Sequence, residues 1–102
     1  MSKLVLDNGY KFVSTFWEDF TVADAFGKDA VNETFDRCFK EWKDNVVYAT
    51  ELVITMSIKS CYWYEKNDEL SMLYSELYHK IDGYNMDHLK GKDMEFYLNT
   101  TD

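Results

Sequence analysis

The chain contains no proline, and glycine occurs only four times among its 102 residues. Without rigid breaks or glycine-rich stretches, the sequence contains no linker, and we expect one helical domain over residues 1–102. Basic residues are also scarce, because 11 Lys and Arg stand against 19 Asp and Glu, a net charge of −8. Phosphate backbones and anionic lipids repel such a protein, so we expect no direct binding to nucleic acid or membrane.

Long apolar runs are missing as well. No stretch of about 18 uncharged apolar residues occurs, so no segment is expected to span a membrane. The first residues, MSKLVLDNGY, lack the apolar run of a secretory signal peptide. These absences predict a cytoplasmic protein.

Residues that carry chemistry are few. Cys38 and Cys61 fit no metal or redox spacing, and their apolar surroundings predict reduced thiols in the core. His79 and His88, the only histidines, form no HExxH or ExxH motif. No Walker loop, GxGxxG, GxSxG or EF-hand pattern is present either. We therefore predict no enzyme, no cofactor and no metal site.

The N-terminal segment KLVLDNGYKFV predicts a β-hairpin over about residues 3–14. Its NG dipeptide, between two apolar runs, suits a two-residue turn that needs positive φ at both positions. In this register Val5 faces Phe12. A hairpin of two strands is marginal in water, so we expect it to lie on an apolar surface.

The rest of the chain predicts helices. Their expected ranges are 14–27, 28–45, 46–65 and 67–83, then one or two turns over 84–91 and a last short helix from 92. Thr15 and Glu18 form a capping box for the first helix, and Asp29 is the expected N-cap of the second. Gly83 is expected to end the fourth.

The segment 46–65 is the expected centre of the fold. Its Val, Ile and Thr favour a strand, but a run of this length without Gly, Pro or a turn is too long for one. A helix that is apolar on most sides is a buried helix. Its Glu51 is expected either to face solvent or to pair with Lys59 or Arg37. The predicted fold is therefore mainly α, with an N-terminal β-hairpin followed by a four- or five-helix compact bundle around a central apolar helix.

The helix before it, 28–45, has the clearest apolar stripe. Val31, Phe35, Cys38 and Trp42 recur at helical spacing, and Trp42 is expected to be a large buried anchor.

The aromatic run CYWY, residues 61–64, is the first candidate interaction site. Four consecutive helical residues point in different directions, so they cannot all face one core. We expect Cys61 and Tyr62 to pack inward. Trp63 and Tyr64 point to other sides, where they either cover neighbouring helices or form a protein interface.

Acidic stripes on two predicted helices are the second candidate. The acids are Glu33, Asp36 and Asp44 on one helix and Asp68, Glu69 and Glu76 on the other. They either imitate the phosphates of a nucleic acid or form a solvated face that keeps the protein soluble. Interleaved lysine and arginine side chains weaken the mimic. All of these acids except Asp44 join Trp63 and Tyr64 as predicted protein-interface residues.

Four segments extend over most of the chain after residue 14: TFWEDFTVADAFG, FKEWKDNVVYATELVITM, WYEKNDELSMLYSELYHKIDGY and LKGKDMEFYLNTTD. They resemble a group of short, acidic, uncharacterised proteins from phages and mobile elements of gut bacteria. The resemblance carries over no catalytic residue. It implies a phage or mobile-element setting, the host-cell cytoplasm as location, and the class of small accessory factors that includes inhibitors of bacterial defence such as anti-CRISPR proteins.

These observations predict a small acidic protein-binding accessory factor. Its expected partner is a protein, with a host nucleic-acid-binding enzyme of a defence system as the sharper hypothesis. The alternative is a homo-oligomeric structural or assembly protein with no inhibitory role. A small enzyme would need a pocket of convergent polar groups, for which the residues provide little.

Overall fold

The structure, a computed structural model, describes residues 6–7, 11–12 and 16–101. Over residues 16–101 the chain is 87% helical. The described helices are α1 (Trp17–Phe26), α2 (Lys28–Trp42), α3 (Val46–Trp63), α4 (Asp68–His88) and α5 (Gly91–Thr101). The predicted helical bundle is thus correct.

The predicted N-terminal β-hairpin is wrong. Near its position the described residues form only two short segments, β1 (Leu6–Asp7) and β2 (Lys11–Phe12), of two residues each. Phe12 lies opposite Leu6 instead of Val5, so the predicted register is displaced by one residue. Two residues per strand provide too few ladder hydrogen bonds and too little apolar surface to make a hairpin part of the fold. The remainder of the predicted range lies outside the described residues.

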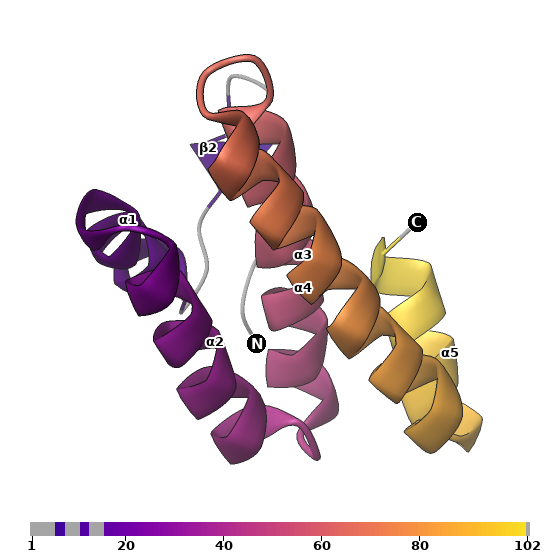
Figure 1. Cartoon of the computed structure of the whole chain (residues 1–102). Helices are drawn as coiled ribbons and strands as arrows, with labels where there is room; N and C mark the ends of the chain where they lie inside the picture. The colour runs from indigo at the N-terminus through magenta and orange to yellow at the C-terminus, as the bar shows by residue number, and fades with distance from the viewer. Residues whose placement is uncertain (1–5, 8–10, 13–15, 102) are drawn as a thin grey trace.

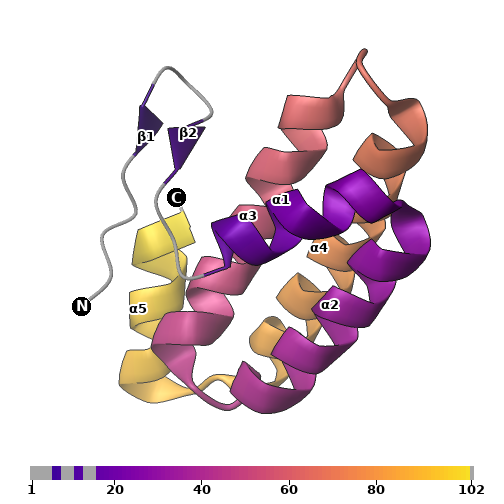
Figure 2. The same cartoon turned by 90° about the vertical axis from the view of Figure 1, so that its left-hand side faces the viewer.

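Helix α3 is the central element, as predicted. It packs against α4, α5 and α2, and it forms an antiparallel pair with α4 (Figures 1 and 2). Polar side chains of α3 are buried together with the apolar ones. The hydroxyl of Thr50 donates to the Val46 carbonyl at 2.6 Å and that of Thr55 donates to the Glu51 carbonyl at 2.7 Å. The hydroxyls of both threonines are therefore hydrogen-bonded within the helix, so their burial leaves no donor unpaired.

The other helices surround this pair. In Figure 1, α2 runs alongside α4, α1 crosses the upper end of α2, and α5 lies on the other side, where it contacts α3. The hydroxyl of Tyr97, a buried side chain of α5, donates to the Asp82 carboxylate on α4. The radius of gyration, 12.9 Å, is that of one compact unit. None of the described helices is long and apolar enough to cross a membrane.

The stripe predicted for residues 28–45 faces the core through Val31, Phe35 and Cys38. Two other helices bury similar sets, which are Phe16, Phe20 and Ala23 near or in α1 and Leu70, Tyr74, Leu77 and Ile81 in α4. Trp42 was predicted as a buried anchor, but it is only half-buried, because it is the last residue of α2. Its ring packs against Tyr48, with 4.4 Å between the ring centroids.

The predicted helix caps are only partly correct. Helix α1 begins after Phe16, which makes no side-chain cap, while Thr15 of the predicted capping box lies outside the described residues. Helix α2 begins directly after Gly27, so Asp29 lies in its first turn and is not the N-cap. Asn67 caps α4, because its side chain accepts a hydrogen bond from the Leu70 N–H at 3.1 Å.

Gly83 does not end α4, contrary to the prediction. The helix continues to His88 and joins the predicted extra turns to the fourth helix. Gly83 lies on its exposed side with helical φ, and the chain breaks only near Gly91, which has a φ of +59°. Burial of Ile81 and Asn85 on either side of the glycine holds the helix together, so packing overrides the weak helix propensity of glycine.

Substitution of Gly83 by alanine is expected to stabilise the protein by about 0.5–1 kcal/mol, because alanine loses less backbone entropy in a helix. A Cβ at this position meets no atom within 4 Å. The measurement is urea unfolding followed by circular dichroism. The matched change Gly27→Ala should destabilise the protein instead, because Gly27 has a φ of +107° that alanine rarely adopts. A loss of stability in Gly83→Ala would contradict the continuous helix.

Candidate functional site

The turn between α3 and α4, residues 64–67, brings the predicted aromatic and acidic candidates together. Helix α3 ends at Trp63, and the N–H groups of Lys66 and Asn67 both donate to the Trp63 carbonyl at 2.9 Å. Glu65 has a φ of +68°, in the left-handed region that non-glycine residues enter at some cost. The chain therefore reverses tightly, and Tyr64 stands next to the first turn of α4.

Trp63 and Tyr64 have different roles. The Trp63 ring is half-buried, and its Nε1–H donates to a carboxylate oxygen of Asp24 at 3.1 Å. Tyr64 is 67% exposed. The prediction that Cys61 and Tyr62 pack inward is wrong, since both are exposed. At this end of α3 the side chains of Lys59 and Trp63 point inward instead, because both bond to the buried Asp24 carboxylate of α1.

A buried polar cluster, which we call the Asp24 cluster, joins three helices. It consists of Asp24 of α1, Lys59 and Trp63 of α3, and Tyr74 of α4. The Asp24 carboxylate accepts hydrogen bonds from Lys59 Nζ at 2.8 Å and from the Tyr74 hydroxyl at 2.5 Å, besides the Trp63 bond. Lys59 Nζ also donates to the Thr21 hydroxyl at 3.0 Å. The exposed fractions of the Asp24 and Lys59 side chains are only 6% and 3%.

The groups of the Asp24 cluster hold α1, α3 and α4 together. Burial, followed by the hydrogen bond to Asp24, raises the pKa of Tyr74, so its phenol remains protonated. The carboxylate has its charge matched by Lys59 and accepts three hydrogen bonds, which leaves no acid or base available to a substrate. The cluster is not visible in the sequence, because Asp24 and Lys59 lie 35 residues apart. The only sign of it in the sequence was Lys59 in an apolar helix, which we considered as one possible partner of Glu51.

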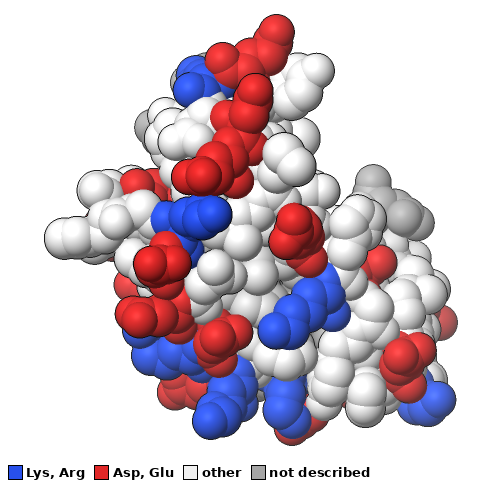
Figure 3. Space-filling view, viewed as in Figure 1, with Lys and Arg blue, Asp and Glu red and all other residues white. Residues whose placement is uncertain are grey.

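The acidic stripes of α2 and α4 come to lie on one face, because the two helices run side by side (Figures 1 and 3). Glu33 and Glu76 are both exposed. Lys28 Nζ lies 3.7 Å from Glu69 Oε2, and Lys80 Nζ lies 3.9 Å from Asp36 Oδ1. Red and blue side chains accordingly alternate over this face in Figure 3. The lysines reduce the negative field of Glu69 and Asp36, which favours the solvated-face interpretation for this part of the surface.

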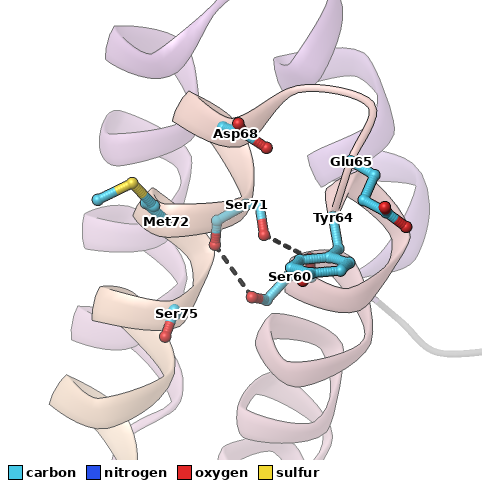
Figure 4. A pocket seen from close by; sticks show the side chains of 7 residues that line it. All are labelled: Ser60, Tyr64, Glu65, Asp68, Ser71, Met72 and Ser75. Carbon is cyan, nitrogen blue, oxygen red and sulfur yellow. Dashed lines mark hydrogen bonds between the residues drawn. The ribbon is translucent and has the colours of Figure 1, made fainter.

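A hollow at the α3–α4 turn, which we call the tip pocket, contains two of the predicted interface residues (Figure 4). It is open to solvent and has a volume of about 770 Å³. Its lining residues are Ser60, Tyr64, Glu65, Asp68, Ser71, Met72 and Ser75. Tyr64 and Met72 are 67% and 65% exposed, so two large apolar side chains border a polar hollow.

The floor of the tip pocket is a reciprocal serine pair. The Ser60 hydroxyl donates to the Ser71 carbonyl at 3.0 Å, and the Ser71 hydroxyl donates to the Ser60 carbonyl at 2.8 Å. Small side chains at these positions let α3 and α4 approach closely, and the two hydrogen bonds fix the helices there. Both hydroxyl protons are used in this way, so the hydroxyl oxygens can only accept further hydrogen bonds.

The charge of the tip pocket is purely acidic. Glu65 and Asp68 line it without any lysine or arginine, and neither makes an ion pair with another residue in the described part of the chain. Lys66 belongs to the same turn but bonds elsewhere. Its Nζ donates to the Tyr62 carbonyl at 3.3 Å and lies 4.7 Å from the centroid of the Tyr62 ring. The carboxylates at the pocket thus differ from Glu69 and Asp36, which have lysine partners.

A surface cluster at the opposite end of α4 holds the α2–α3 connection in place. Asp44 accepts hydrogen bonds from Lys43 Nζ and from the Tyr84 hydroxyl, each at 3.1 Å. These two bonds lower the pKa of Asp44. The bond to Asp44, followed by a second one from Lys43 Nζ to the Tyr84 hydroxyl at 3.4 Å, raises the pKa of Lys43. The His88 ring stacks on Tyr84 with 3.9 Å between centroids. The acid, the lysine and the tyrosine thus bond one another at the surface.

The remaining chemical candidates are isolated. Cys38 is buried, and burial raises its pKa to about 11, so its thiol is not a nucleophile at neutral pH. Cys61 is exposed, contrary to the prediction of a core thiol. Among the described residues no three His, Cys, Asp or Glu side chains are grouped to hold a metal ion.

No family model matches the chain, and no significant match exists among curated proteins or solved structures.

Proposed function

We propose that the protein is a small non-enzymatic accessory factor that binds another protein through the tip of its α3–α4 hairpin. One observation carries this proposal: exposed Tyr64 and Met72 border a hollow whose carboxylates have no cationic partner among the described residues. Tyr offers a large contact area at little entropic cost, and Met adapts to irregular partners. Acids next to such anchors form the polar rim of an interface.

The proposed partner is a basic protein surface. The net charge of −8 favours association with a cationic partner and speeds the encounter. Proteins that handle nucleic acids present such surfaces. Together with the resemblance to phage and mobile-element proteins, this supports an anti-CRISPR-like inhibitor that covers the basic surface of a host defence enzyme in the cytoplasm. Such an inhibitor acts by occupying the basic surface of its partner, so it requires no catalytic residue.

The test of this proposal is Tyr64→Ser. The partner is first identified by affinity capture from a host lysate with mass spectrometry, and its affinity is then measured with purified proteins by calorimetry. Loss of the Tyr64 ring should weaken binding about tenfold or more, as for an interface hot spot. Trp63 is kept unchanged because it belongs to the Asp24 cluster. Glu33→Gln, on the α2 face with its lysines, is the control and should leave the affinity within about twofold.

Contrary evidence would be an unchanged affinity for a folded Tyr64→Ser variant. Folding is checked by the thermal midpoint of unfolding, which an exposed Tyr should hardly affect. In that outcome the partner binds elsewhere, and the tip of the hairpin is not the interface.

A second candidate is self-association through α1. Val22 and Phe26 lie one turn apart on this helix and are 59% and 78% exposed, so the described surface includes an apolar patch outside the lining of the tip pocket. This favours the homo-oligomeric structural or assembly role. Sedimentation velocity separates the two candidates: Phe26→Ser would shift an oligomer towards monomer, whereas Tyr64→Ser would not.

A further inference from the structure

We infer that the tip pocket receives an arginine side chain of the partner protein. This inference rests on the proposed function and specifies the chemistry that the pocket recognises. It follows from three independent properties of the site, namely its charge, the hydrogen-bonding sense of its floor, and the position of an exposed aromatic ring.

The charge of the pocket selects a cation. Asp68 stands at the start of α4 above Ser71, whereas the Glu65 side chain points away from α4 at the rim (Figure 4). Glu69 and Asp36 already have lysines within 4 Å on the neighbouring face, but Asp68 has no such partner among the described residues. The field of Asp68 therefore remains available to an incoming group.

The floor of the pocket also selects a hydrogen-bond donor. The hydroxyl protons of Ser60 and Ser71 are committed to carbonyls across the helix pair, so both oxygens present lone pairs to the pocket. An anion would find no donor in the Ser60–Ser71 pair. The N-terminus of α4 does not reverse this preference, because Asn67 caps it and two acids, Asp68 and Glu69, occupy its first turn.

The Tyr64 ring distinguishes arginine from lysine. In Figure 4 it lies beside Ser60, across the hollow from α4. A planar guanidinium can stack on this ring and direct its N–H groups at once to the Asp68 carboxylate and the serine oxygens. A lysine ammonium provides a point charge but no stacking face. The hollow, about 770 Å³, has room for the whole side chain.

The experiment uses the full chain labelled with ¹⁵N and blocked tripeptides as probes. Acetyl-Gly-Arg-Gly-amide is titrated in parallel with the same peptide carrying lysine or citrulline, the latter having arginine's shape without its charge. Amide shifts should saturate for the arginine peptide and centre on residues 60–75. Citrulline should bind about tenfold more weakly, since it lacks charge-assisted hydrogen bonds, and lysine should fall between them.

Asp68→Asn should weaken arginine binding about tenfold and remove the preference over citrulline. Asp93→Asn is the matched control, since Asp93 also lies in the first turn of an exposed helix end but away from the pocket. It should leave the affinity unchanged.

Three results would overturn the inference: citrulline binding as strongly as arginine, Asp68→Asn without effect, or shifts spread over all acidic surfaces. The proposed function would survive any of them if Tyr64→Ser still weakens binding of the captured partner. It would fail separately if the peptide result holds but Tyr64→Ser leaves that partner bound.

Discussion

Replacement of Asp24 by alanine is expected to lower the free energy of unfolding by about 3–5 kcal/mol, the range for breaking a buried ion pair from one side. The change leaves the Lys59 ammonium, the Trp63 indole and the Tyr74 hydroxyl without their common acceptor. Lys59 is 3% exposed in its side chain, so water cannot replace the lost carboxylate without opening the core. Chemical denaturation followed by circular dichroism measures the loss.

The control is Asp36→Ala, which also removes an aspartate from an ion pair. Asp36 lies 3.9 Å from Lys80, and their side chains are 71% and 56% exposed. A surface pair of this kind contributes about 0–1 kcal/mol. Equal losses at Asp24 and Asp36 would show that the Asp24 cluster is hydrated, and α1 would then not be fixed to the α3–α4 pair by it.

A double variant separates the ion pair from its surroundings. Asp24→Leu combined with Lys59→Met replaces both charges with apolar side chains of similar size. Its loss should be well below the sum of the two single losses, since neither charge remains buried without its counterpart. Additive losses would mean that Asp24 and Lys59 act independently.

Phe35→Ala is expected to have an effect of similar size, a loss of about 3–5 kcal/mol. The Phe35 side chain has 0% exposure, and its ring stacks on Phe39 with 5.6 Å between centroids. Its removal opens a cavity that the surrounding helices cannot fill without moving. Since a domain of this size is stable by about 5–15 kcal/mol, the variant should melt many degrees below the native protein.

Phe26→Ala is the matched control, because it removes the same atoms from a side chain that is 78% exposed. This change should alter the free energy of unfolding by less than about 0.5 kcal/mol. A large loss at Phe26 would indicate that another part of the chain or a second copy covers α1, which would favour the self-association candidate.

The helices and most of their buried faces could be predicted from local pattern. Phe35 and Cys38 fall on one side of α2 because apolar residues recur at the helical period, and this period requires no knowledge of the neighbours. Length decided the type of α3, since a run so long without a turn does not fit a strand. The errors fall where local rules compete with packing. Gly83 did not stop α4, and the predicted N-terminal hairpin is not part of the fold.

Only part of the candidate site could be predicted from the sequence. Trp63 and Tyr64 were predicted together because they are neighbours, but the fold packs Trp63 half-buried against Asp24 and leaves Tyr64 exposed. The acidic stripes were found as charges on helix faces. Which acids have lysine partners depends on which helices run side by side, and helical periodicity does not contain that information.

The sequence by itself therefore determined the helical class, the central position of α3 and the acidic surface, because propensity, period and charge are properties of short segments. Tertiary structure alone decided that Asp24 meets Lys59, Trp63 and Tyr74, that Ser60 and Ser71 close the floor of a pocket, and that Asp68 lies open beside Tyr64. These contacts join residues up to 50 positions apart. Their partners are chosen by the relative placement of α1, α3 and α4, which depends on how all the buried surfaces pack at once.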